Sequence, residues 1–202
     1  LTRMKVALEF LEDSQAKQSL RADIEEMEKM VSEILETARR QHKYENLEKQ
    51  RVSMAAFIKQ TIVAFENQPP GIEIVDLPSE IEVEIDPEQI KAVFENVLNN
   101  ATKYSQPNSA PIQISAKLED SYAVVRITDF GIGIPEEDLT HIFEPFYRVD
   151  KSRTKDTGGY GLGLSLCKTI MEAHGGKIVV HSRLQEGTTV FLYFPSATTS
   201  AV

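Results

Sequence analysis

The first 43 residues carry apolar positions spaced alternately three and four residues apart, a pattern typical of helices that pair along a seam. These positions are Leu1, Met4, Leu8 and Leu11, followed by Leu20, Ile24, Met27, Val31, Ile34 and Ala38. Asp13-Ser14-Gln15 separates the two runs, so the pattern predicts an antiparallel helical hairpin over residues 1–43. Two helices bury so narrow a seam poorly, which favours a dimeric four-helix bundle. The alternative is a hairpin packed on the rest of its own chain.

Beyond a polar stretch from residue 41, which predicts a linker over residues 44–51, helical and alternating segments interleave. Helices are predicted over residues 54–67 with Ser53 as the cap, from Asp86-Pro87 to about Tyr104, from Pro135, and from the glycines at 158–163 to about Ala173. Strands, mostly antiparallel, are predicted over residues 72–77, 81–85, 111–118, 122–129, 177–182 and 188–194. The order predicts an α+β fold, a two-layer α/β sandwich over residues 52–195, before a small polar tail at 196–202.

The composition argues against several classes of protein. The chain of 202 residues holds 22 Lys and Arg against 31 Asp and Glu, and its net charge of −9 argues against binding to nucleic acid or to a membrane surface. The single cysteine, Cys167, excludes an internal disulfide and agrees with a reducing compartment. No apolar run approaches the roughly 18 residues of a membrane helix, and the chain opens inside a helical pattern. Both features predict a soluble piece of a longer protein.

The helix that ends near Tyr104 carries polar side chains on one face. Asn96, Asn100 and Lys103 are spaced four and three residues apart, so they share one stripe of the helix. Amide oxygens suit a hard cation such as Mg²⁺. The stripe therefore indicates either a site for a polar ligand or an ordinary solvated face.

A second candidate is 129-DFGIGIP-135, in which Asp129 ends a strand and Gly131 and Gly133 follow. Glycines at such a place let a flat ligand approach the backbone. An aspartate beside them can accept a hydrogen bond from an exocyclic amine such as that of adenine. An ordinary turn between a strand and a helix is the alternative.

The segment from residue 143 to residue 163 combines positive charge with glycines. In the loop from residue 148 to residue 157, the basic residues are Arg148, Lys151, Arg153 and Lys155, against Asp150 and Asp156. Local cations in an acidic chain favour an anionic ligand such as phosphate. The glycines at 158, 159, 161 and 163 precede a helix whose unpaired N–H groups can bind an anion, although no Walker A lysine follows. A flexible charged loop and a hinge before a capped helix are the alternatives.

In their order and spacing, these segments resemble the kinase core of a bacterial sensor histidine kinase. Residues 96–103 resemble the N box, 129–135 the G1 box (DxGxGxP), 143–148 the F box and 159–164 the G2 box (GxGLGL). The resemblance covers almost all of residues 52–195. It implies the Bergerat sandwich of the GHKL ATPase superfamily, with ATP and Mg²⁺ as cofactors.

The resemblance also implies a role for each matching residue. Asn100 would ligate Mg²⁺, Asp129 would bind the adenine amine, and the glycines at 159, 161 and 163 would hinge a lid over ATP. The implied catalytic residues are Asn96, Lys103 and Arg148. The implied nucleotide contacts are Asn96, Asn100, Lys103, Tyr104, Asp129, Gly131, Gly133, Ile134, Arg148, Gly159, Tyr160, Gly161, Leu162, Gly163, Leu164 and Thr189. Phe130 stands where the family often has Asn, and we expect its side chain to point away from the adenine.

Residues 1–43 resemble the dimerisation and phosphotransfer hairpin of this family, without its phosphoacceptor histidine. None of the four histidines, His42, His141, His174 and His181, lies in the matching motif. The resemblance therefore implies a homodimer that binds ATP but, as this chain alone, does not phosphorylate itself. It implies a response-regulator receiver domain as partner, and a cytoplasmic location in a parent protein compatible with an inner-membrane anchor. Neither nucleic acid nor direct membrane contact is expected.

Two other functions stay open at this level. Other GHKL ATPases, such as a topoisomerase, a chaperone or a MutL-like clamp, place a water-activating glutamate one helical turn before the magnesium asparagine. This chain has Asn96 there, and Glu95 is one residue off. An anti-sigma-like nucleotide-binding regulator would share the nucleotide motifs, but the helical hairpin argues against it.

Overall fold

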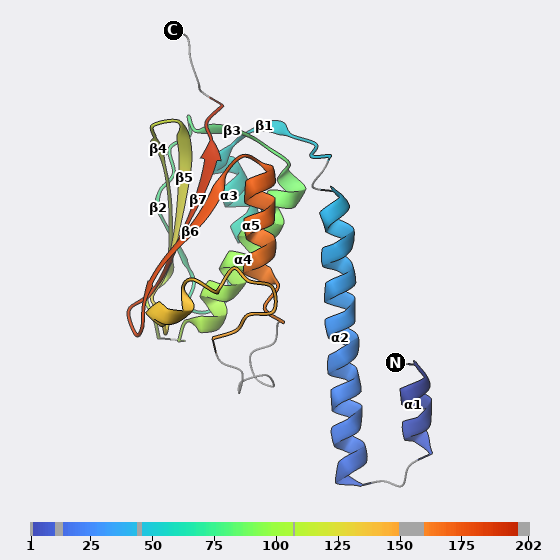
Figure 1. Cartoon of the computed structure of the whole chain (residues 1–202). Coiled ribbons are helices and arrows are strands. Elements are labelled where there is room, and N and C mark those ends of the chain that lie inside the picture. The colour runs from blue at the N-terminus through green and yellow to red at the C-terminus, as the bar shows by residue number, and fades with distance from the viewer. Residues whose placement is uncertain (1, 11–13, 44–45, 107, 150–159, 198–202) are drawn as a thin grey trace. The chain divides into compact units, whose positions relative to one another are not determined.

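The computed structural model describes the whole chain except residues 1, 11–13, 44–45, 107, 150–159 and 198–202 (Figure 1). The chain divides into two compact units, Leu1–Glu45 and Asn46–Val202. Each unit is described by itself.

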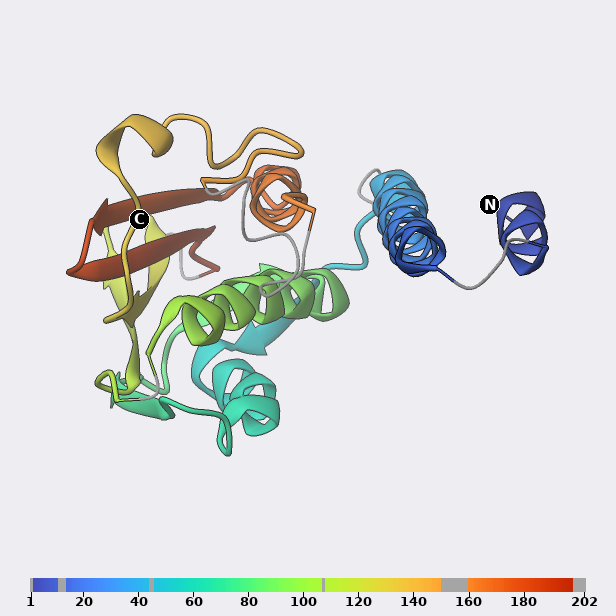
Figure 2. The same ribbon diagram turned by 90° about the horizontal axis from the view of Figure 1, so that it is seen from below.

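The N-terminal unit consists of two consecutive helices, α1 (Thr2–Glu9) and α2 (Gln15–Lys43), which lie side by side (Figures 1 and 2). The Ser14 hydroxyl accepts a hydrogen bond from Lys17 N at 3.2 Å at the start of α2. Ile24 is buried, whereas other apolar residues of the predicted seam are exposed: Met4, Leu20, Met27 and Val31. α2 extends to Lys43, so the first residues of the polar stretch belong to the helix. No helix in the described part of the chain is both long and apolar enough to cross a membrane.

A five-stranded sheet forms one layer of the second unit, in the order β2-β4-β5-β7-β6. Its strands are β2 (Ile72–Asp76), β4 (Ile112–Glu119), β5 (Tyr122–Asp129), β6 (Lys177–Arg183) and β7 (Gly187–Pro195). β2 and β4 pair in parallel, and the other three pairs are antiparallel. β7 lies between β5 and β6, so both neighbours fix its register.

Helices form the second layer, as predicted. α4 (Pro87–Tyr104) and α5 (Gly163–Ala173) cover one face of the sheet, and α3 (Met54–Ile62) packs on α4 through the rings of Phe57 and Phe94, whose centroids are 5.5 Å apart (Figures 1 and 2). The core between the layers consists of large apolar side chains, including Phe94, Leu98, Ile127, Ile170, Leu192 and Phe194. The predicted two-layer α/β sandwich is thus confirmed.

Helix ends follow the predicted capping residues. The Ser53 hydroxyl accepts from Ala56 N at 3.4 Å, and the Asp86 carboxylate accepts from Glu88 N at 3.1 Å, as the pattern predicts. The predicted bounds of α4 are confirmed. α3 is shorter than predicted, because its last turn tightens into the 3₁₀ segment η1 (Val63–Phe65).

Three segments differ from the prediction. β1 (Gln50–Ser53) begins inside the predicted linker and pairs with β3 (Glu82–Ile85) in a separate two-stranded sheet. The helix predicted from Pro135 is a single 3₁₀ turn, η2 (Glu136–Asp138). At the start of the predicted tail, Ser196 N donates to Ser121 O at 2.9 Å and Ala197 N donates to Glu82 O at 3.3 Å. Pairing partners distant in sequence order these segments, which local patterns do not reveal.

Candidate functional site

Asp129 ends β5 on the face of the sheet that the helices cover. Its Oδ1 accepts hydrogen bonds from Gly131 N at 3.0 Å and from Thr188 N at 3.2 Å. The residue is 8% exposed, and burial raises the pKa of its carboxyl, an effect that the two backbone N–H groups partly offset. No hydrogen bond from the described residues reaches Oδ2. One oxygen of this buried carboxylate is therefore used by the fold, and the other is available to a ligand.

The loop after Asp129 packs tightly against two other elements. A Cβ on Gly131 would collide with Tyr104 O at the end of α4, and Ile132 N donates to the same carbonyl at 3.1 Å. Gly133 has a φ of +69°, and a Cβ there would collide with Arg183 O at the end of β6. Glycine is required at both positions because backbone approaches backbone. The predicted G1 loop is thus held between α4 and the β6–β7 hairpin.

The predicted polar stripe lies along the C-terminal half of α4. Asn96 and Asn100 are half-buried, and Asn96 Nδ2 donates to Ala92 O at 2.9 Å. Lys103 is half-buried with its ammonium 4.8 Å from the centroid of the Tyr104 ring, and Tyr104 is 39% exposed. The stripe therefore has partly accessible amides and a cation near the loop that holds Asp129.

The glycine segment meets α4 where α5 begins. A Cβ on Gly163 would lie 2.7 Å from Asn96 Oδ1, so the start of α5 lies directly against the stripe. Gly161 has a φ of +75°, and its carbonyl accepts from Phe146 N at 3.0 Å. The N-cap residue of α5 is Leu162, and among the described residues its side chain makes no capping hydrogen bond. The remaining predicted contacts in this segment, Arg148, Tyr160 and Leu164, are half-buried, and Ile134 N in the G1 loop donates to Ser182 Oγ at 2.8 Å.

Part of the predicted lid cannot be placed. Gly158 and Gly159, like the basic residues Lys151, Arg153 and Lys155, lie outside the described residues. Their proposed role as a lid stays a prediction.

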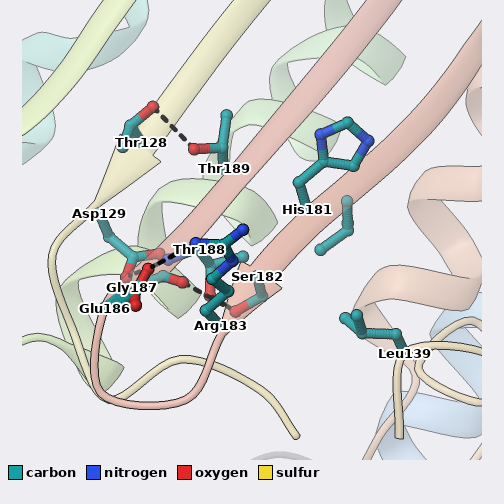
Figure 3. A pocket seen from close by; sticks show the side chains of 11 residues that line it. Thr128, Asp129, Leu139, His181, Ser182, Arg183, Glu186, Gly187, Thr188 and Thr189 are labelled. Carbon is teal, nitrogen blue, oxygen red and sulfur yellow. Dashed lines mark hydrogen bonds and ion pairs between the residues drawn. The ribbon is translucent and has the colours of Figure 1, made fainter. Parts of the chain in front are cut away.

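The structure separates two neighbouring threonines of β7. Thr188 pairs with Asp129 and shares its face of the sheet, whereas the next residue, Thr189, points to the opposite face. There the hydroxyls of Thr189 and Thr128 lie 3.1 Å apart (Figure 3). Thr188 therefore shares the sheet face of Asp129, and the predicted contact Thr189 lies on the other face of the strand, although both threonines line the pocket described next.

A pocket of about 510 Å³ opens at this end of the sheet. It is lined by Thr128, Asp129, Leu139, Val180, His181, Ser182, Arg183, Glu186, Gly187, Thr188 and Thr189 (Figure 3). The lining contains Asp129 and Thr189 from the predicted set, and none of the predicted residues on α4. It includes both Ser182 and Thr188, which the motifs did not single out. The pairing of these two residues across the β6–β7 hairpin would have indicated that they share a face with Asp129.

The histidines have structural surroundings. His174 is buried, its Nδ1 donates to Ile170 O at 2.7 Å, and its Nε2 accepts from Asp86 N at 3.0 Å. Both ring nitrogens are therefore occupied. Burial lowers the pKa of His174. His141 Nδ1 lies 2.8 Å from Glu144 Oε1, and the His181 ring contacts Phe191 on the outer face of the sheet. The side chain of His42 is not among those described.

Comparisons with known proteins agree with this architecture. Residues 85–198 match the family described as histidine kinase-, DNA gyrase B-, and HSP90-like ATPase. The sensor protein kinase WalK of Staphylococcus haemolyticus is 38% identical over 179 residues, which are 87% of this chain and 29% of WalK. The signal transduction histidine-protein kinase ArlS of Staphylococcus aureus is 37% identical over 182 residues, which are 88% of this chain and 40% of ArlS.

A solved structure gives the same result for the fold. The catalytic domain of the histidine kinase ThkA superposes with a TM-score of 0.63 at 28% identity, covering 74% of this chain and 98% of that domain. This chain spans well under half the length of the two curated relatives. Because the named relatives are histidine kinases, the other ATPases of the superfamily are not favoured. The chain belongs to the histidine kinase-, DNA gyrase B-, and HSP90-like ATPase family, and it resembles the part of bacterial sensor histidine kinases that contains their ATP-binding domain.

Proposed function

We propose that the adenine of ATP binds at Asp129, with the phosphates toward α4 and the start of α5. The observation that carries this proposal is the half-used carboxylate of Asp129, whose Oδ1 accepts two backbone N–H groups while no described residue donates to Oδ2. An acceptor oxygen that the fold leaves without a donor can accept a hydrogen bond from a ligand. The exocyclic amine of adenine supplies such a donor, and Gly131 and Gly133 leave the backbone open to a flat ring.

The phosphate end of the proposed site combines positive charge with amide groups. Lys103 on α4 and Arg148 before the lid contribute the cations. The uncapped N–H groups of α5 favour an anion at the same place, and Gly163 lets them lie against Asn96. These groups would hold the triphosphate in one orientation.

A magnesium ion fits this site through the amide oxygen of Asn100. The described residues include no group of three or more His, Cys, Asp or Glu side chains that could hold a metal ion. Mg²⁺ prefers oxygen ligands, keeps several waters and is commonly held by one or two protein groups together with phosphate oxygens. When bound, it would neutralise charge on the phosphates.

In the intact protein, the reaction we infer is transfer of the γ-phosphoryl group of ATP to a histidine nitrogen. An N–P bond forms while the bond from the γ-phosphorus to the β–γ bridging oxygen breaks, and ADP leaves. The neutral imidazole already has a lone pair, so no base needs to remove a proton first. Asn96, Lys103 and Arg148 would therefore act by positioning the phosphates and neutralising their charge.

The acceptor histidine is proposed to lie outside the second unit. His174 cannot serve, because both of its ring nitrogens are hydrogen-bonded in the core. The phosphohistidine would pass its phosphoryl group to an aspartate of a response-regulator receiver domain. Exposed apolar residues along the first unit, such as Leu20, Met27 and Val31, support a homodimer formed through these helices.

Water activation by a glutamate is not supported by the position of Glu95. Its carboxylate lies 3.7 Å from Lys91 Nζ, one helical turn away on α4, and the side chain is 44% exposed. Asn96, at the place where the hydrolytic relatives would have their base, cannot accept a proton. A kinase therefore explains the site better than a water-activating ATPase.

Asp129→Asn tests the proposal directly. An asparagine keeps one oxygen for Gly131 N and Thr188 N but presents an amide N–H₂ group to the adenine amine. We expect the Kd for ATP to rise by at least about 100-fold, because a buried donor would face a donor. The thermal midpoint should move by less than about 5 °C. Asp120→Asn at the exposed β4–β5 turn is the matched control. Calorimetry showing unchanged ATP affinity in Asp129→Asn would refute the adenine assignment.

A further inference from the structure

Ser182 on β6 has a hydroxyl whose hydrogen-bonding capacity is fully used. Its Oγ donates to Gly187 O at 2.8 Å, accepts from Ile134 N at 2.8 Å and lies 2.9 Å from Thr188 Oγ1. A serine hydroxyl offers one donor and two acceptor sites. All three are used if the Thr188 hydroxyl donates to Ser182. Figure 3 shows Ser182 beside Gly187 and Thr188 at the end of the β6–β7 hairpin.

These three contacts join the two segments that hold Asp129. Ile134 ends the G1 loop, in which Gly131 N donates to Asp129 Oδ1. Thr188 begins β7, and its N–H donates to the same oxygen. Ser182, on a third strand, therefore connects the two segments that carry these donors. Its hydroxyl makes no hydrogen bond to the carboxylate itself.

The surrounding backbone contacts make this linkage stiff. Gln185 N donates to Ile132 O at 2.7 Å, so the hairpin turn and the G1 loop are also joined at their middle. A Cβ on Gly187 would collide with Asp129 O, which places the start of β7 directly on the end of β5. A shift of the Ser182 hydroxyl would move groups that lie in contact with Asp129.

We infer that Ser182 is a positioning residue that fixes the Asp129 carboxylate and thereby sets the preference for adenine over a purine with a carbonyl at position 6. This inference rests on the proposed adenine site. A carboxylate selects an amine over a carbonyl by attracting the one and repelling the other, and the selection weakens if the carboxylate can turn away. Residues behind a ligand-binding group commonly affect affinity by holding that group in place.

The test compares ATP with inosine triphosphate, whose base has a carbonyl at position 6 in place of the adenine amine and a hydrogen on N1. Ser182→Ala removes the three contacts, and Ser182→Thr keeps the hydroxyl. We expect Ser182→Ala to raise the Kd for ATP roughly tenfold and to change the Kd for inosine triphosphate less than about twofold. The ratio of the Kd for inosine triphosphate to the Kd for ATP should therefore fall about tenfold. Ser182→Thr should restore the ratio. Faster amide exchange of Ile134 N–H in Ser182→Ala should accompany the loss.

A matched control separates positioning from general destabilisation. Thr61→Val removes another buried hydroxyl, which donates to Phe57 O at 2.9 Å within α3. It should lower the thermal midpoint as Ser182→Ala does while leaving the ratio of the two affinities unchanged. An unchanged ratio in Ser182→Ala, or an equal change in Thr61→Val, would overturn the inference. The Asp129→Asn variant separates a failure of the adenine site from a failure of the Ser182 inference. If Asp129→Asn loses ATP affinity while Ser182→Ala keeps the ratio of the two Kd values, only the role of Ser182 is refuted.

Discussion

Two aspartates of the second unit are almost equally buried and have different surroundings. Asp86, 9% exposed at the start of α4, uses both carboxylate oxygens: Oδ1 accepts from Glu88 N and Gln89 N, and Oδ2 accepts from Glu48 N at 3.2 Å. Asp129, 8% exposed at the end of β5, uses only Oδ1 among the described residues. Burial alone therefore does not distinguish Asp86 from Asp129, the proposed binding residue. Acceptor capacity left unused by the fold does so better.

The largest expected effect would come from removing the structural aspartate. Asp86→Ala takes the acceptor away from three backbone N–H groups, which should destabilise the unit by roughly 2–4 kcal/mol in urea denaturation. ATP affinity, measured on the folded protein, should stay within about twofold. Asp129→Asn should show the reverse pattern, so the two variants form a matched pair. If Asp86→Ala weakens ATP binding as strongly as Asp129→Asn, the assignment of Asp86 to stability and Asp129 to ATP binding is refuted.

Gly163→Ala should test the proposed phosphate end of the site, where α5 begins against Asn96. The new methyl group would lie 2.7 Å from Asn96 Oδ1, so the asparagine side chain has to turn away. Stability should change by less than about 1 kcal/mol, because alanine suits a helix better than glycine. We expect a several-fold rise in the Kd for ATP by calorimetry. Thr169→Ala, on the exposed side of α5, is the control, and equal affinities for the two variants would exclude a role for Asn96.

The smallest expected effect is a dependence of the free energy of unfolding on pH that comes from His174, the partner of Asp86 N. Burial lowers the pKa of His174, so below its ordinary value of about 6.5 the unfolded chain binds a proton that the folded chain does not. Stability should therefore be constant above that value and fall by at most about 1.4 kcal/mol per pH unit below it. His174→Gln, which does not titrate, should lack this contribution in urea denaturation at successive pH values. Parallel curves for the two proteins would exclude His174 as the source.

The sequence allowed prediction of features that depend on neighbours along the chain. The bounds of α4 were predictable because Asp86 and Pro87 together make a strong helix start, and the sandwich followed from interleaved helical and alternating segments. β1 was missed because it is ordered by pairing with β3, some thirty residues later, and carries no alternating apolar pattern of its own.

Inside the candidate site, too, features that depend on pairing with distant segments were not predicted. The motifs indicated Asp129 and the glycines, whose types are unusual at those places. They did not distinguish Thr188 from Thr189, because that choice depends on which face of the sheet each residue occupies, and pairing with both β5 and β6 sets it. Ser182 was missed for a similar reason, since its partners Ile134 and Gly187 come from two other segments.

The position of β7 has a consequence for the order in which the protein acquires its activity during synthesis. The strand is the last of those described, yet it lies between β5 and β6 and supplies the Thr188 N–H that holds Asp129. In a ribosome-bound chain that ends before Gly187, β5 has an unpaired edge. The Asp129 carboxylate then has Gly131 N as a donor but lacks Thr188 N. If ATP binds at Asp129 as proposed, nucleotide cannot stabilise such an intermediate, and ligand-assisted folding begins only after β7 has emerged. Until then the exposed edge of β5 is the surface that chaperones or aggregation would meet first.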